Sequence, residues 1–163
     1  MNVERLRIGQ GFDVHAFDSV PPLKIGGVIV DETRGLAGTS DADVLVHAVA
    51  DAVLGAAALG DLGSHFPSND ERWSDADSLE LLSKVVDMVK SAGLDVVNVD
   101  TTVMAQSVLI EPHRADIRAN LAQTLNIHVA DVSVKATTTD QLGFLGRDEG
   151  VAASAIVALV ATH

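Results

Sequence analysis

The sequence predicts an α/β (α+β) fold, a single-domain sandwich in which helices cover one face of a mixed four-stranded sheet and a small hairpin lies beside it. Strand-like and helix-like hydrophobic patterns follow one another in the order strand, helix, helix, strand, helix, strand. The length of 163 residues suits one domain over 1–163. Hydrophobic residues make up 47% of the chain but aromatic residues only 3%, so Val, Ala, Leu and Ile must build the core.

The N-terminal part of the chain is predicted to be extended. Residues 6–17 alternate in hydrophobicity as a strand does. Gly9 and Gly11 interrupt this pattern, at points where the backbone must bend or approach another element closely. Two short apolar runs, 23–25 and 28–30, are joined by two glycines, which predicts a hairpin at a sheet edge or flap.

Helices and strands then alternate toward the C-terminus. A proline-free run rich in Ala, Val and Leu predicts a helix over 42–59, with Ser40 and Asp41 as candidate N-caps. The last segment, 151–161, is apolar on both alternating faces, as in a central strand or one that also lines a subunit contact. The remaining predicted elements are a helix over 77–91 capped by Ser74 or Asp75, a helix over 114–125, and strands over 96–106 and 132–138.

Charge and composition exclude several classes of function. The formal net charge of -12 disfavours nucleic-acid binding, which depends on Lys and Arg side chains that neutralise phosphates. Because the chain has no cysteine, it forms no disulfides, and a metal could bind only to nitrogen and oxygen. We see no signal peptide and no apolar run of membrane length, so we expect a cytoplasmic protein without membrane contact.

Asp13 and His15 are the most informative pair, because side chains two residues apart in a strand point to the same side. His47 lies in the apolar helix between Asp43 and Asp51, at spacings of four residues that place all three on one stripe. Each residue alone is more often an ordinary hydrogen-bonded group than a ligand. Together, Asp13, His15 and His47 match the three protein ligands of a catalytic zinc. Asp43 and Asp51 would be available to hold ligands or substrate.

Lys135 and the segment 137–140 end a predicted strand with one cation, three hydroxyls and a carboxylate. Hydroxyls and backbone amides can bind phosphate oxygens, and Asp140 can hold a hard cation such as Mg2+. The run could equally reflect the preference of Thr for strands. Arg147 with Glu149 could add a cation to the site or simply form a solvated pair.

Four motifs occur in order along the chain: Gly11-Phe12-Asp13-Val14-His15, Ser40-Asp41-Ala42-Asp43 with His47, Leu59-Gly60-Asp61-Leu62-Gly63, and Lys135 to Asp140 with Leu142-Gly143-Phe144. From about Arg7 to the C-terminus the chain thereby resembles the 2-C-methyl-D-erythritol 2,4-cyclodiphosphate synthase family of the non-mevalonate isoprenoid pathway. The resemblance implies a homotrimer of α/β subunits with active sites between neighbours, each holding Zn2+ and a second ion, Mg2+ or Mn2+. It also implies a phosphorus-oxygen lyase that converts 4-diphosphocytidyl-2-C-methyl-D-erythritol 2-phosphate to the cyclic diphosphate and CMP.

The resemblance assigns the site residue by residue. The zinc ligands would be Asp13, His15 and His47, and the catalytic residues Thr39, Thr138 and Asp140. The substrate contacts would be Ser40, Asp61, Leu62 and Gly63 for the methylerythritol phosphate; Phe66, Pro67, Ser68, Asn69 and Asp70 as a mobile wall; Ala105, Gln106, Ser107, Val108, Leu109, Ile110 and Glu111 for the cytidine held by the neighbouring subunit; and Thr137, Thr138, Thr139, Asp140, Phe144 and Arg147 for the diphosphate. The set of substrate contacts also includes Asp13, His15, Thr39, Asp51 and Lys135.

The chain departs from the family pattern at three places, and these keep alternatives open. Thr39 stands where the family usually has a His that stabilises the transition state, Val108-Leu109 replaces Pro-Lys, and Asp140 stands where Glu is common. One alternative is a metal-dependent phosphatase or phosphodiesterase that activates water. The other is a metal- or nucleotide-binding trimer without activity.

Overall fold

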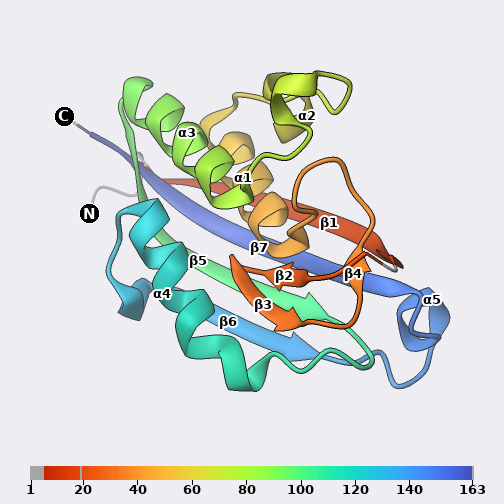
Figure 1. Ribbon diagram of the computed structural model, residues 1–163. Helices are drawn as coiled ribbons and strands as arrows, with labels where there is room; N and C mark the ends of the chain where they lie inside the picture. The colour runs from red at the N-terminus through yellow and green to blue at the C-terminus, as the bar shows by residue number, and fades with distance from the viewer. Residues whose placement is uncertain (1–5, 19, 163) are drawn as a thin grey trace.

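A mixed sheet with the strand order β4-β1-β7-β5-β6 forms the centre of the computed structural model, which describes residues 6–18 and 20–162 (Figure 1). β1 pairs antiparallel with β7, β7 pairs antiparallel with β5, and β5 pairs parallel with β6. The predicted mixed sheet of four strands is confirmed for these four. Their bounds are Leu6–Asp18 for β1, Leu94–Met104 for β5, Val132–Thr137 for β6 and Gly150–Ala161 for β7.

A fifth strand, β4 (Gly35–Leu36), extends the sheet beyond β1 by two residues. It was not predicted, since two residues are too few to show an alternating pattern. The predicted hairpin is confirmed as a separate two-stranded sheet of β2 (Leu23–Ile25) and β3 (Val28–Asp31). Leu23 and Ile25 are fully buried, so the hairpin forms part of the core.

Three long helices cover one face of the sheet, and the hairpin lies among them on that face (Figure 1). The helices are α1 (Val44–Ala57), α3 (Ser78–Ser91) and α4 (Arg114–Leu125). All three were predicted to within two residues at each end. The short elements are α2 (Leu62–His65), α5 (Gly143–Gly146) and the 3-10 turns η2 (Glu71–Trp73), η3 (Glu111–His113) and η4 (Val129–Asp131).

The N-caps of α1 and α3 differ from those predicted. Asp43 caps α1, and its side chain accepts a hydrogen bond from Val46 N, so Ser40 and Asp41 are not the caps. Ala42 has a left-handed φ of 54°, and this turn delays the helix until after Asp43. Asp77 caps α3 in place of Ser74 or Asp75, because the 3-10 turn η2 occupies the residues just before Ser74.

α1 packs against β1 at backbone contact distance. A Cβ atom on Gly9 would lie 1.9 Å from Ala52 O, and one on Gly11 would lie 1.9 Å from Ala48 O. The predicted close approach at these glycines is therefore confirmed. Residues of β1 at odd positions consequently face α1, because side chains alternate along a strand.

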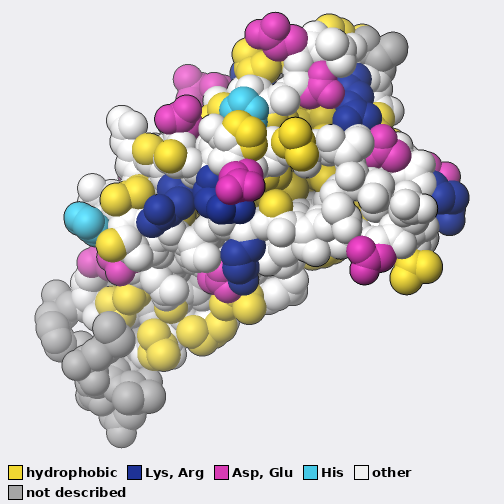
Figure 2. Space-filling view, turned by 90° about the horizontal axis from the view of Figure 1, so that it is seen from below, with side chains coloured by type: hydrophobic (Ala, Val, Ile, Leu, Met, Phe, Trp, Pro, Cys, Tyr) yellow, Lys and Arg dark blue, Asp and Glu magenta, His cyan; other side chains and the backbone are white. Residues whose placement is uncertain are grey.

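The opposite face of the sheet is not covered by a helix (Figure 1). Large apolar side chains of β1 and β7 are exposed there: Ile8 is 59% exposed, Phe12 52% and Ile156 50%. In Figure 2, hydrophobic side chains reach the surface in several places, with Lys, Arg, Asp and Glu side chains between them. Among residues 6–18 and 20–162, none of the helices combines the length and apolar character that a membrane span needs.

Candidate metal and phosphate site

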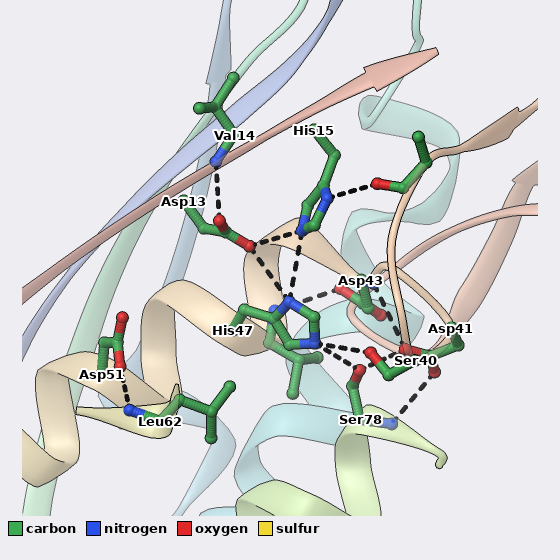
Figure 3. Close-up of polar contacts among 12 residues, drawn as sticks. Asp13, Val14, His15, Ser40, Asp41, Asp43, His47, Asp51, Leu62 and Ser78 are labelled. Carbon is green, nitrogen blue, oxygen red and sulfur yellow. Dashed lines mark hydrogen bonds and ion pairs between the residues drawn. The ribbon is translucent and has the colours of Figure 1, made fainter. Parts of the chain in front are cut away.

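The sequence pair Asp13 and His15 lies near the carboxyl end of β1, and both side chains point toward α1 (Figure 3). Val14 N donates to Asp13 Oδ1 at 2.9 Å, which leaves Asp13 Oδ2 directed at the histidines. The distance from Asp13 Oδ2 to His15 Nε2 is 2.8 Å. The two-residue spacing thus produces the predicted pair.

His47 lies in the first turn of α1 and directs Nδ1 at the same point. Its Nδ1 is 3.1 Å from Asp13 Oδ2 and 3.4 Å from His15 Nε2. These three residues are the one group of three or more His, Asp and Glu in the described chain whose ligand atoms all lie within 4.8 Å of one another. The candidate metal site predicted from the sequence is therefore present.

The donor set fits a divalent transition metal. A tetrahedral zinc ion with bonds of about 2.0–2.1 Å needs ligand atoms about 3.3 Å apart, and the three measured separations are 2.8, 3.1 and 3.4 Å. Two imidazole nitrogens and one carboxylate oxygen are ligands that zinc commonly takes. The side chains of His15, His47 and Asp13 are only 18%, 15% and 26% exposed. The cluster is thus shielded but reachable.

Hydrogen bonds behind the cluster orient both imidazoles. His15 Nδ1 lies 2.6 Å from Ala37 O, so Nδ1 donates there, and in the neutral imidazole that a metal binds Nε2 carries the lone pair. His47 Nε2 lies 2.9 Å from Ser78 Oγ and 3.1 Å from Ser40 Oγ. Such partners fix the orientation of metal-binding histidines. Ser78 was not identified from the sequence, since a serine at a helix start resembles any capping residue.

Mutual contacts also shift the ionisation of the cluster. Burial acts to raise the pKa of Asp13, but hydrogen bonds from His15 and His47 and their charges outweigh it and hold that pKa well below its usual value. Burial acts to lower the pKa of His15, and the hydrogen bond and charge of Asp13 outweigh it and raise that pKa. The carboxylate is therefore ionised at neutral pH, as a metal ligand must be.

The two aspartates flanking His47 both accept hydrogen bonds from backbone N–H groups. Both oxygens of Asp43 are used by the backbone: Oδ1 accepts from Gly26 N at 2.9 Å and Oδ2 from Gly27 N at 2.7 Å. Asp43 is fully buried, so the expectation that it holds a ligand or substrate is wrong. Asp51 Oδ1 accepts from Leu62 N at 2.7 Å, which ties α1 to the start of α2.

The segment after α1 forms the next part of the predicted site. Asp61 caps α2 and accepts from Ser64 N and Ser64 Oγ, while Leu62 and Gly63 form the first turn of that helix. Phe66 is buried against Trp73, with ring centroids 5.0 Å apart. The remaining members of the predicted wall are Pro67, Ser68, Asn69 and Asp70, and Asp70 caps the turn η2.

A cavity of about 270 Å³ lies at the carboxyl ends of β5 and β6. Its lining contains most of the predicted cytidine segment: Ala105, Gln106, Val108, Leu109, Ile110 and Glu111, together with Val103, Arg114, Ala136, Thr137 and Thr138. Ser107 instead bonds to Asp148 and Arg34 outside the cavity. Arg114 was not predicted, and within the described residues its buried Nε has no hydrogen-bond partner.

The threonine segment 137–139 begins at the last residue of β6. Only some of its hydroxyl groups are free to bind phosphate. Thr137 Oγ1 donates to Thr138 O and Thr139 Oγ1 donates to Leu142 O. Thr138 Oγ1 accepts from Asp140 N at 3.3 Å, so its own hydrogen remains free to donate. Asp140 is exposed and has a left-handed φ of 52°.

The predicted cations of this region are paired in the single chain. Lys135 Nζ lies 2.7 Å from Asp100 Oδ2, and both side chains are about half exposed. Arg147 lies 3.2 Å from Glu149, and both side chains are more than half exposed. Thr39 and Phe144 are also exposed.

Comparison with known proteins identifies the chain's relatives. The model of the YgbB family matches residues 6–160. A 2-C-methyl-D-erythritol 2,4-cyclodiphosphate synthase from Salinibacter ruber is 57% identical over 150 residues, which cover 92% of this chain and 96% of the relative. The protein of the same name from Shouchella clausii is 53% identical over 154 residues, covering 94% and 97%.

Solved structures agree with this relationship. The bifunctional IspDF from Campylobacter jejuni superposes with a TM-score of 0.93 at 43% identity, over 96% of this chain and 42% of that longer chain. IspF from Plasmodium falciparum, solved as a CDP complex, superposes with a TM-score of 0.85 at 30% identity over 98% of both chains. The family match, the relatives and the shared fold together confirm the resemblance of the four motifs. The chain belongs to the YgbB family.

Proposed function

We propose that the protein converts 4-diphosphocytidyl-2-C-methyl-D-erythritol 2-phosphate to 2-C-methyl-D-erythritol 2,4-cyclodiphosphate and CMP. The observation that carries this proposal is the convergence of Asp13, His15 and His47 in a chain that is 57% identical, over nearly its full length, to a synthase of that product. The alternatives of a phosphatase and an inactive trimer have no comparable support.

The metal of this site is Zn2+ held by Asp13, His15 and His47, and Asp140 contributes to a second site for Mg2+ or Mn2+. Bound there, the ions supply Lewis acidity toward phosphoryl oxygen and neutralise charge. The donor spacing described above supports the first site. For the second, the exposed carboxylate of Asp140 beside Thr138 offers the oxygen ligands that a hard cation prefers.

The reaction needs little acid-base help from the protein. An oxygen of the 2-phosphate, already anionic, forms a bond to the β-phosphorus, and the bond from that phosphorus to the CMP oxygen breaks with its electron pair leaving on CMP. Holding these atoms in line can supply several kcal/mol of the barrier reduction. The residues that fold the substrate therefore matter more than a general base.

Hydroxyl donors near the reacting phosphates stabilise the charge that develops there. Thr39, exposed and adjacent in sequence to Ser40, and Thr138, with a free hydroxyl hydrogen, fill this role. Ser40 and residues 61–63 hold the methylerythritol phosphate, and Asp51 keeps Leu62 in place through its 2.7 Å bond. Phe66 to Asp70 close the site on one side.

The metal cluster and the cavity lie at the same end of the sheet, where β1, β5 and β6 finish, but they are far apart within one chain. β1 carries the metal cluster, whereas the cavity lies beyond β5 and β6, and three strand spacings separate β1 from β6. At about 4.8 Å for each spacing the two halves are about 14 Å apart. A neighbouring subunit can bring its own cavity to the metal cluster, so we place the active sites between the subunits of a homotrimer.

The uncovered sheet face supports this assembly. Ile8, Phe12 and Ile156 form an exposed apolar surface there, of the kind that subunit contacts bury. Light scattering should give the mass of three chains, and replacing Phe12 with Asp should shift the protein to monomers. A monomeric wild-type protein with full activity would contradict the intersubunit site.

The cavity at the carboxyl ends of β5 and β6 is proposed to hold the cytidine. Its lining combines apolar side chains with Gln106, Glu111 and Arg114 as polar groups. A related structure holds CDP. Val108 and Leu109 contribute apolar surface where the family usually has Pro-Lys, so the side chain of Arg114 becomes the cation of this cavity.

Phosphorus NMR tests the proposal directly. The purified protein, Zn2+ and Mg2+ are incubated with the diphosphocytidyl substrate, with His47→Ala as the matched control. Appearance of the cyclic diphosphate and CMP in equal amounts is expected for the wild type and not for the variant. Release of inorganic phosphate would indicate the phosphatase, and unchanged substrate would indicate a binding protein without activity.

A further inference from the structure

Ser78 and Asp41 lie directly behind the metal ligand His47 (Figure 3). Ser78 is the first residue of α3 and is only 1% exposed, one of the few fully buried polar side chains in the described chain. Its Oγ lies 2.9 Å from His47 Nε2, and the same Oγ donates to Asp41 Oδ1. Asp41 Oδ2 accepts from Ser78 N at 3.1 Å. One carboxylate thus holds Ser78 at both its hydroxyl and its backbone N–H.

The direction of these hydrogen bonds determines where His47 carries its proton. A serine hydroxyl has one hydrogen, and a carboxylate can only accept, so the hydrogen of Ser78 is committed to Asp41. Ser78 Oγ therefore offers a lone pair to His47, and Nε2 of His47 must donate. The neutral imidazole that a metal binds has one N–H, so its Nδ1 carries the lone pair, and Nδ1 is the atom that lies 3.1 Å from Asp13 Oδ2.

We propose that Asp41 and Ser78 form a relay that fixes the tautomer and orientation of His47 for metal binding. Asp41 orients Ser78, and Ser78 orients His47. Both are positioning residues, since neither places a side-chain atom where Asp13 Oδ2, His15 Nε2 and His47 Nδ1 converge. The relay rests on the proposed metal site but not on the proposed reaction.

Ser40 offers a second oxygen to His47 Nε2, at 3.1 Å, but it is a poorer anchor. It is half-buried and is proposed to contact substrate, so its hydroxyl changes partners during turnover. Ser78 is buried and held twice by Asp41, so its hydroxyl is anchored more firmly than that of Ser40. The relay also connects the ligand to the first turn of α3, which follows the predicted mobile wall.

Zinc affinity measured by competition with a chromophoric chelator tests the relay. Ser78→Ala and Asp41→Asn should each lower affinity about 10- to 100-fold, the usual effect of losing an outer partner of a ligand histidine. Ser91→Ala is the matched control, since Ser91 lies on the same helix and its hydroxyl bonds only to Asp87 O. Its affinity should stay within about twofold of wild type.

A double-mutant cycle separates a relay from simple loss of charge. If Asp41 acts through Ser78, the combined variant should bind zinc no more weakly than Ser78→Ala alone. Additive losses, or unchanged affinity in Ser78→Ala, would overturn the relay. Asp41→Asn conserves size and keeps Ser78, so it decides the question even if Ser78→Ala does not fold.

NMR of the zinc-loaded protein gives a readout that a purely structural role would not change. The Nε2–H proton of His47 should be visible and slow to exchange in the wild type, and fast in Ser78→Ala. Slow exchange of this proton in both the wild type and Ser78→Ala would contradict the relay. Wild-type protein that binds no zinc would overturn the proposed metal site and the relay with it, whereas zinc binding without cyclisation would overturn the reaction alone.

Discussion

Replacing Gly11 with Ala should disrupt the metal cluster without removing any ligand. The new Cβ atom would lie 1.9 Å from Ala48 O and 2.8 Å from Ala52 N, both in the backbone of α1. Since Cβ contacts below 3.0 Å essentially do not occur, α1 and β1 must separate by about 1.1 Å or more at this point. His47 directly precedes Ala48, so the separation carries His47 away from Asp13.

The size of this displacement sets the expected effect. Metal sites tolerate changes of about 0.2 Å in ligand distances, far less than the required shift. Zinc affinity should therefore fall at least about 100-fold, the upper end of what loss of an outer partner causes. Overpacking of this kind also costs about 1–3 kcal/mol of unfolding free energy, which lowers the melting temperature by roughly 2–12 °C in a chain of this length.

Gly55→Ala is the matched control because it lies on the same helix with nothing within 4 Å of its Cβ position. It should leave zinc affinity unchanged and stabilise the helix by up to about 1 kcal/mol. Chelator competition and thermal unfolding are measured on both variants. A Gly11→Ala protein that binds zinc as tightly as wild type and melts at the same temperature would refute the reasoning.

Three further predictions concern other parts of the molecule. Hydrogen bonds from Thr33 and Arg34 lower the pKa of Asp31 to about 2, so the stability they give is present above pH about 4 and is lost as the pH falls toward 2. Asp31→Asn should lower the unfolding free energy in urea by about 1 kcal/mol at pH 6 and by almost nothing at pH 2, and equal losses at both would contradict this. Arg114→Met should raise KM for the nucleotide substrate about 10-fold with kcat nearly unchanged, and an unaltered KM in steady-state kinetics would remove Arg114 from the cytidine site. Thr39→Val should lower kcat about 10-fold while zinc affinity stays the same, whereas an unchanged kcat would show that this hydroxyl does not act on the reacting phosphates.

Local patterns were sufficient to predict most of the fold. Hydrophobic residues at helical spacing predicted a helix over 114–125, and α4 spans those residues. The Asp13 and His15 pair needed only the two-residue period of a strand. β4 could not be predicted, because its two residues join the sheet through the path of the chain and not through any pattern of their own.

The partners of buried polar groups were harder to predict. Nothing near Ser78 in the sequence indicates that it lies behind His47, since the two are 31 residues apart and meet only when α3 packs on α1. Arg114 was hard to predict for the same reason, because it lines the cavity together with residues 136–138, which lie far from it in the sequence. Sequence patterns indicate that a side chain needs a partner, but the tertiary contacts decide which partner it finds.

The polar stripe of α1 illustrates how these contacts fix the site. Each of its three members joins the helix to a different segment: Asp43 to the turn of the hairpin, His47 to β1 and α3, and Asp51 to the start of α2. Burial raises the pKa of Asp43 to about 6, so ionising this carboxyl at neutral pH costs stability that its three backbone donors must offset. Asp43 and Asp51 lie one turn before and one turn after His47, so the ligand cannot rotate or slide along the sheet without breaking one of these attachments. The glycines of β1 set the remaining dimension, the distance between helix and strand. Hence His47 is held in place by residues that lie outside the candidate metal cluster.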